Sequence, residues 1–174
     1  MERRVAGSLL VLGFASLFVA GLLYTLISAG SAGLGATKVT ALEIGFALTA
    51  FGLVAFEFTL AETVARILAR VGTIAFVAGA ILWTVAEVIN LDQGTFISHF
   101  ERNYVMLACV AGAAIGGIAF RTGMPRWFGW MSVIWAVGDA ILYLLGIFPA
   151  PLGPNLVMFV LGVLLLRQRA ADTR

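Results

Sequence analysis

Four acidic residues stand inside apolar stretches of the sequence, where a charge is costly: Glu43, Glu57, Glu87 and Asp139. Placing an ionisable group at the centre of a hydrocarbon layer costs about 2.5–3.5 kcal/mol on insertion scales. Such groups therefore face a protein interior or a water-filled cavity, where they can bind ions, protons or cationic solutes. Asp139 is the strongest candidate for chemistry, because no basic residue lies within several helical turns of it in the sequence.

Aromatic residues accompany two of these acids at helical spacing. Trp83 precedes Glu87 by four residues, and Trp135 and Tyr143 lie four residues before and after Asp139. Residues four apart share one face of a helix, so each ring should lie beside its acid. A carboxylate against aromatic faces suits a cation or an organic amine. If the carboxyl group is protonated, the same walls suit an apolar or polyene ligand.

Together these residues predict one ligand pocket in the outer half of a bilayer. Tyr24 should reach a depth similar to that of Glu43. In a simpler interpretation, Glu43 pairs with Lys38 or reaches lipid headgroups. The ligand-binding residues that we expect are Asp139, Glu87, Glu43, Trp83, Trp135, Tyr143 and Tyr24, with His99, Asp92 and Glu101 at the entry.

The acids near the inner ends of the helices have a structural interpretation. Glu57 is expected to pair with Arg66 or Arg70 across the inner interface. Glu62 is expected to pair with Arg66, which follows it by four residues. These ion pairs would hold helix ends together and take no part in ligand binding.

The elements that position these residues are membrane-spanning helices. Of the 174 residues, 61% are hydrophobic and only 11% are charged, and the mean hydropathy is +1.05. A soluble domain carries about 25% charged residues, so this chain has too little polar surface for a water-facing globule. Its small excess of basic residues follows membrane topology, and nucleic acid is not an expected partner.

Six stretches are long, or nearly long, enough to cross a bilayer, which takes roughly 20 apolar residues. They predict an all-α, polytopic transmembrane bundle that forms a single domain over residues 1–174, without a soluble domain. The sixth stretch is the weakest, because it is short and opens with prolines. The predicted helices span approximately residues 5–28, 39–60, 71–91, 104–120, 127–148 and 152–166.

Basic residues test this threading independently, because they accumulate on the cytoplasmic side of short loops. With the N-terminus inside, only Lys38 and Arg102 of the 11 basic residues lie outside. An even number of crossings keeps the C-terminal arginines inside, which supports the sixth helix. Both termini are therefore expected in the cytoplasm, with Trp127 and Trp130 in an interfacial aromatic belt.

Two features predict how the helices pack. Trp83 and Glu87 recur as Trp135 and Asp139 at the same spacing, which predicts three helical hairpins related by a pseudo-repeat; chance is the alternative. The stretch 112–116 begins and ends with glycine and is otherwise rich in alanine. Such a small-xxx-small surface packs closely against another helix, of the same chain or of a second copy.

The helix openings resemble those of small, uncharacterised multi-pass membrane proteins of bacteria. The resemblance rests on the Arg-x-x-Gly start at Arg4 and on the segment from Met124 to Trp130. It implies an integral protein of the bacterial inner membrane and no particular activity.

The leading hypothesis is a protein that binds, and could transport, a small cation, a proton-coupled solute or an amphipathic ligand. With one histidine and one cysteine, the chain cannot form a two-histidine haem site or a Cys/His zinc cage, and no metal or cofactor is predicted. Membrane lipids are expected partners, as are further copies or a larger complex.

Two alternatives stay open. The protein could be an accessory or structural subunit of a larger membrane complex, in which its acids pair with basic residues of a partner. It could also be an intramembrane enzyme that uses Glu87 and Asp139 as an acid/base pair on a lipid or isoprenoid. The enzyme is the less favoured, since no recognisable catalytic motif supports it.

Overall fold

The computed structural model describes residues 2–28, 32–93, 98–146 and 152–171, without the side chains at several helix ends. All regular structure in these segments is helical, which confirms the predicted all-α class. A short 3-10 helix, η1 (Ala32–Leu34), leads into the second α-helix. The α-helices are α1 (Glu2–Ser28), α2 (Gly35–Phe58), α3 (Thr63–Gln93), α4 (Ser98–Arg121), α5 (Arg126–Leu144) and α6 (Leu152–Ala171).

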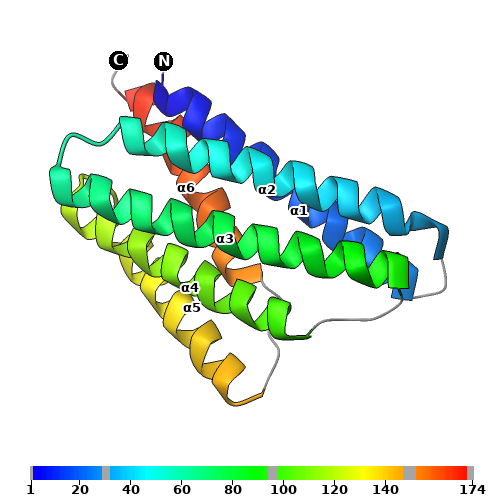
Figure 1. Ribbon diagram of the computed structural model, residues 1–174. Coiled ribbons are helices and arrows are strands. Elements are labelled where there is room, and N and C mark those ends of the chain that lie inside the picture. The colour runs from blue at the N-terminus through cyan, green and yellow to red at the C-terminus, as the bar shows by residue number, and fades with distance from the viewer. Residues whose placement is uncertain (1, 29–31, 94–97, 147–151, 172–174) are drawn as a thin grey trace.

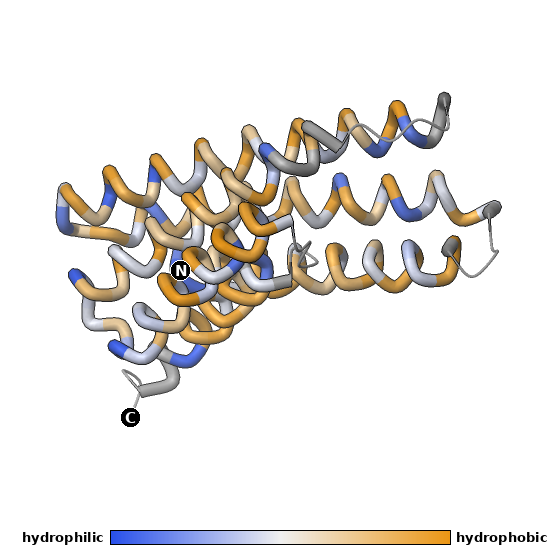
Figure 2. The backbone as a smooth tube through the Cα atoms, turned by 90° about the horizontal axis from the view of Figure 1, so that it is seen from below, coloured by the Kyte–Doolittle hydropathy of each residue, from blue (hydrophilic) through white to orange (hydrophobic). Residues whose placement is uncertain are grey.

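Five of these helices, α1 to α5, are long and apolar enough to cross a membrane. Hydrophobic residues predominate along them in Figure 2. The sixth helix carries a shorter apolar segment, Asn155–Arg167. The structure therefore has the helices of a membrane bundle, while a full sixth crossing stays a prediction.

Consecutive helices run in opposite directions, so that both chain ends lie at the same end of the bundle (Figure 1). We call this the basic end, because the arginines near the starts of α1, α3 and α5 and at the end of α4 gather there. The first two helices pack along their length, as do α3 and α4. In contrast, α6 packs mainly on α1 and α5 mainly on α4, so the third predicted hairpin differs from the other two. The pseudo-repeat stays a prediction.

Helix α3 starts at Thr63, whereas the sequence predicted a start near residue 71. The predicted boundary placed Arg66 and Arg70 in a connection. Both arginines instead lie on the helix with exposed side chains, which a long, flexible stem allows. Helix α5 stops at Leu144, because Gly146 adopts a φ of 76°, a helix-terminating conformation that favours glycine.

Small residues bring the helix backbones together. A Cβ atom on Gly7 of α1 would lie 2.8 Å from the carbonyl oxygen of Gly162 on α6, so neither position has room for a side chain. On α4, a Cβ atom on Gly116 would lie 3.0 Å from the carbonyl oxygen of Gly129 on α5. The small-residue surface of α4 therefore packs within the same chain.

Candidate functional site

Glu87 forms a buried ion pair. The Nζ atom of Lys38, in the first turn of α2, lies 2.5 Å from Oε2 of Glu87 on α3, and the two side chains are only 9% and 4% exposed. The ring of Tyr24 on α1 approaches the same ammonium group, with its centroid 5.3 Å from Nζ. Residues from α1, α2 and α3 thus meet at the Lys38 ammonium group, whose charge is neutralised by Glu87. The approach of an aromatic ring to a cation is itself favourable.

Glu43 does not join this pair. It lies on the exposed side of α2, whereas Lys38 and Leu42 are buried on the inner side. The expected pairing of Glu43 with Lys38 is therefore not found, because Lys38 pairs with Glu87. Within the described part of the chain, Glu43 makes no ion pair.

Asp139 lies in a different environment, between α5 and the start of α6. The residue is 3% exposed, and its Oδ2 atom has no hydrogen-bond partner among the described residues. A Cβ atom on Gly153 would lie 2.5 Å from that oxygen and 2.6 Å from the Trp135 indole, so the α6 backbone lies directly against the carboxyl group. Cys109 is buried on α4, the helix on which α5 mainly packs.

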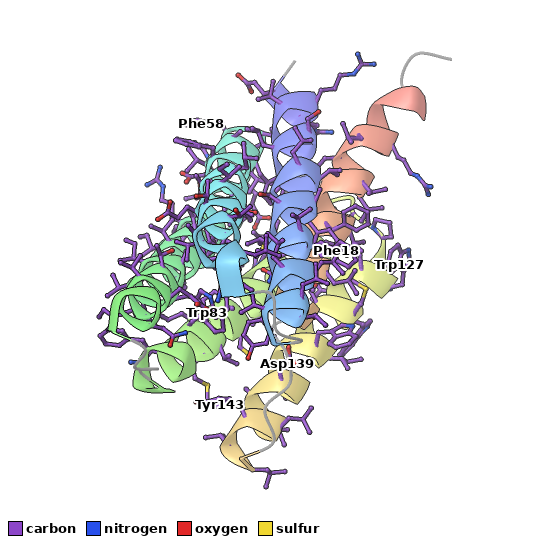
Figure 3. The ribbon with its side chains drawn as sticks, turned by 90° about the vertical axis from the view of Figure 1, so that its right-hand side faces the viewer. Phe18, Phe58, Trp83, Trp127, Asp139 and Tyr143 are labelled. Atoms are coloured by element: carbon purple, nitrogen blue, oxygen red, sulfur yellow. The ribbon has the colours of Figure 1, made fainter. Side chains whose placement is uncertain are left out.

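A row of aromatic and polar side chains connects α3 with the start of α6. The rings of Trp83 and Tyr104 have centroids 5.0 Å apart. The Tyr104 hydroxyl lies 3.5 Å from Oδ1 of Asn155, two residues after Gly153. The buried Nε1 atom of Trp83 has no hydrogen-bond partner in the described part of the chain. In Figure 3, Trp83 lies in the same half of the molecule as Asp139, away from Phe58 at the basic end.

The expected single pocket is therefore divided. Tyr24 and Glu87 gather around Lys38, Trp135 lies with Asp139 at the α5–α6 contact, and Glu43 lies on the outer surface. Tyr143 is half-buried one turn after Asp139 on α5. Of the residues expected at the entry, Asp92 lies in the last turn of α3, and His99 and Glu101 lie in the first turn of α4; their side chains are not among those that the structure describes.

Five residues at these two sites were not among the predicted ligands: Lys38, Tyr104, Cys109, Gly153 and Asn155. Lys38 carried a usable signal, because it is one of only two basic residues predicted at the outer end, and Glu87 is predicted at a similar depth. The other four carried none, since no charge or motif marks them among the apolar helices.

Ion pairs at the basic end join neighbouring helices. The Nε atom of Arg70 lies 2.5 Å from Oε1 of Glu57, which is one of the two expected pairings. Glu62 bonds Arg121 of α4, with Nη1 and Oε1 2.8 Å apart, where Arg66 had been expected. Arg66 instead donates to the carbonyl oxygen of Ala61 at 3.4 Å. Glu62 therefore ties the start of α3 to the end of α4.

This exposed pair should contribute little to stability. We expect Arg121→Gln to lower the free energy of unfolding by less than about 1 kcal/mol, because both partners remain accessible to solvent. Thermal unfolding at low and high salt checks this value. A larger loss, insensitive to salt, would show that the pair is shielded from solvent.

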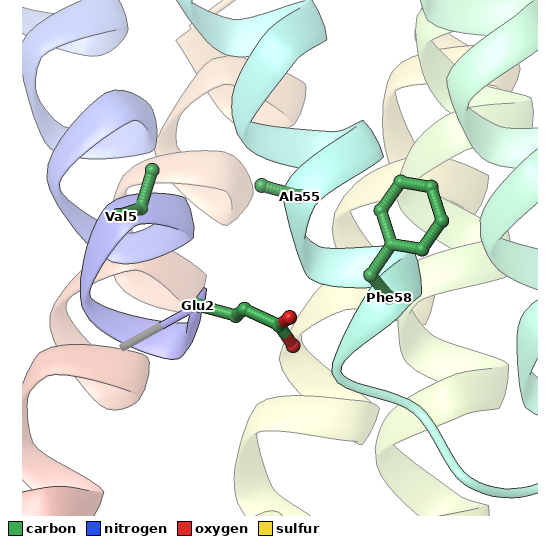
Figure 4. Close-up of a pocket in the computed structure, with 4 residues that line it drawn as sticks. All are labelled: Glu2, Val5, Ala55 and Phe58. Carbon is green, nitrogen blue, oxygen red and sulfur yellow. The ribbon is translucent and has the colours of Figure 1, made fainter.

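A shallow hollow also lies at the basic end, between the start of α1 and the end of α2 (Figure 4). It is lined by Glu2, Val5, Ala55 and Phe58. None of these residues belongs to the predicted ligand pocket. Among the residues that the structure describes, no group of three or more histidine, cysteine or acidic side chains could hold a metal ion.

Comparisons of the chain with protein-family models, curated proteins and solved structures find no match. What the protein does is therefore inferred from its own residues.

Proposed function

We propose that the chain is an integral protein of a bacterial inner membrane, crossing it six times with both termini in the cytoplasm. Five apolar helices of sufficient length support membrane insertion. The gathering of arginines at the basic end supports a cytoplasmic position for that end, because basic residues accumulate on this side. The bacterial membrane rests on the resemblance of the helix openings.

We further propose that the protein binds a cation at Asp139, in the outer half of the bilayer, and that transport of this cation is its activity. One observation carries this proposal: the residue is only 3% exposed, and its carboxyl group forms no ion pair with a basic residue of the described chain. A buried charge is costly without a partner, so a bound cation or proton neutralises it. Trp135 beside it offers an aromatic wall to a cation.

Glu87 has a structural role in this proposal. Its charge is already neutralised by Lys38, so it is not available as a second ligand. The same pairing weighs against the alternative of an enzyme that uses Glu87 and Asp139 as an acid/base pair, because the two acids lie in separate environments.

The accessory-subunit alternative is favoured by one observation, the exposed Glu43. It stands on the outer side of α2 beside the exposed apolar Ile44, with no ion pair in the described part of the chain. A basic residue of a partner helix could meet it there. Purification in mild detergent tests this: the alternative requires a stoichiometric partner that Glu43→Gln releases, and a homogeneous single-chain particle contradicts it.

The cation proposal is tested by Asp139→Asn. We would measure proton, sodium and tetramethylammonium binding to protein in lipid nanodiscs, and their uptake into liposomes. We expect at least one of the three to bind to the natural protein and to be taken up, and Asp139→Asn to reduce both signals to background. The matched control is the double variant Lys38→Met/Glu87→Gln, which should keep both. Equal binding and uptake by Asp139→Asn and the natural protein would refute the proposal.

A further inference from the structure

The cation that Asp139 accepts can be specified further from the surroundings of its carboxyl group. Resting on the proposed function, we propose that the bound cation is a proton, and that Gly153 in the first turn of α6 is the residue that excludes anything larger. Three observations support this inference: the space beside the carboxyl group, the chemistry of its neighbours and the position of the basic residues.

The space beside the carboxyl group is closed by backbone. A Cβ atom on Gly153 would lie 2.5 Å from Oδ2 of Asp139, a distance that real Cβ atoms essentially never show. The same atom would lie 2.6 Å from Cε3 of Trp135. The side facing α6 thus has no room for a single methyl group, and an organic ammonium ion is larger than that. A proton needs no such space.

The neighbours are poor ligands for a metal ion. Hard cations such as sodium or magnesium take several oxygen ligands, and magnesium takes six. Beside Asp139 lies the indole ring of Trp135, which offers no oxygen ligand. Two oxygen-bearing side chains of α4 and α6, Tyr104 and Asn155, are uncharged and contact each other. No group of three or more histidine, cysteine or acidic side chains that could hold a metal ion exists within the described segments. A lone carboxyl oxygen is sufficient for a proton.

The charged and titratable groups around Asp139 are few. Tyr143 lies on α5, the same helix as Asp139, and Cys109 and Tyr104 lie on α4. The first turn of α6 contributes Gly153 and Asn155, which carry no charge. At the start of α4, the structure describes the backbone of His99, Glu101 and Arg102 but not their side chains. The buried lysine at this end of the bundle is held by Glu87. A proton is thus the neutralising group that fits all the described neighbours.

Infrared spectroscopy distinguishes the candidate cations, because a protonated carboxyl group has a C=O stretching band that a carboxylate lacks. We would titrate the natural protein in lipid bilayers with acid and base and record this band. We expect a band that disappears at high pH, is missing in Asp139→Asn, and is retained in Lys38→Met/Glu87→Gln. Saturating sodium chloride or tetramethylammonium chloride should leave the band and its titration midpoint unchanged.

Two outcomes would overturn the inference in different ways. If sodium or tetramethylammonium removes the Asp139 band at constant pH, a larger cation displaces the proton; the identity of the ligand is then wrong, but the cation site stands. If Asp139→Asn changes neither the band nor any cation response, both the inference and the proposed function fail.

The role of Gly153 has its own matched pair of variants. A methyl group at Gly153 would overlap the carboxyl oxygen, whereas a Cβ atom on Gly138 of α5 meets nothing within 4 Å. In variants that retain native helix content and elution volume, Gly153→Ala should shift the C=O band and its titration midpoint, and Gly138→Ala should leave both in place. An unchanged band in a folded Gly153→Ala protein would overturn the assignment of Gly153.

Discussion

Replacing Lys38 with methionine is expected to destabilise the protein by about 3–5 kcal/mol, because it leaves the Glu87 carboxylate buried without its partner. Both side chains of this pair are more than nine-tenths buried, so water does not replace the lost ammonium group. The loss would appear as a lower free energy of unfolding in a denaturant titration of the protein in mixed micelles.

The double variant Lys38→Met/Glu87→Gln supplies the control for this prediction. Removing both charges leaves no uncompensated ion, so we expect the double variant to recover most of the lost stability. The exposed Arg121→Gln provides a second comparison with a small expected effect. If Lys38→Met is as stable as the double variant, then Glu87 does not carry a buried charge, and the ion pair does not hold α2 to α3.

In a separate variant, substituting Gly162 with valine is expected to lower the free energy of unfolding by about 1–3 kcal/mol from overpacking alone. A Cβ atom at this position would lie 2.9 Å from the carbonyl oxygen of Gly7 and 3.0 Å from Cβ of Leu10. Because a backbone carbonyl group cannot change rotamer as a side chain does, α6 has to move away from α1. The same denaturant titration measures the cost.

Gly21 on α1 is a suitable control for this variant. It is also a helical glycine, but a Cβ atom there meets nothing within 4 Å and the position is exposed. Gly21→Val should therefore change stability by less than Gly162→Val, since the intrinsic helix propensities of the two substitutions are the same. Equal losses in both variants would mean that the close contact between α1 and α6 does not stabilise the fold.

The helices themselves could be predicted, because the prediction of each one depends on the summed hydropathy of many residues. An apolar stretch of about 20 residues is a signal that no single side chain can cancel. Helix ends depend on a few residues, which explains the error at α3. Two arginines so close together, Arg66 and Arg70, predict a connection between helices, yet their exposed side chains allow the backbone beneath them to stay helical.

The acids of the candidate site could be found from the sequence because charges in apolar stretches are rare. Their partners could not be assigned so easily, because pairing depends on how each helix is rotated. Lys38 and Glu43 are five residues apart, which places them about 140° apart around a helix. The lysine of α2 therefore faces Glu87 while Glu43 faces outward. The contact between Asp139 and Gly153 depends on the path of α6, for which the sequence contains no periodic signal.

The unequal lengths of the helices have a consequence for the surrounding lipid. Helix α3 has 31 residues and is about 46 Å long, whereas α5 has 19 residues and is about 28 Å long. A hydrocarbon core of about 30 Å matches the whole of α5, whereas the extra length of α3 lies in end turns that carry Arg66, Arg70 and Asp92. These polar turns can extend into the headgroup layers, so that the apolar middle of α3 still matches the core without a hydrophobic mismatch. The ends of α3 would then project beyond the hydrocarbon core, where those of α5 do not.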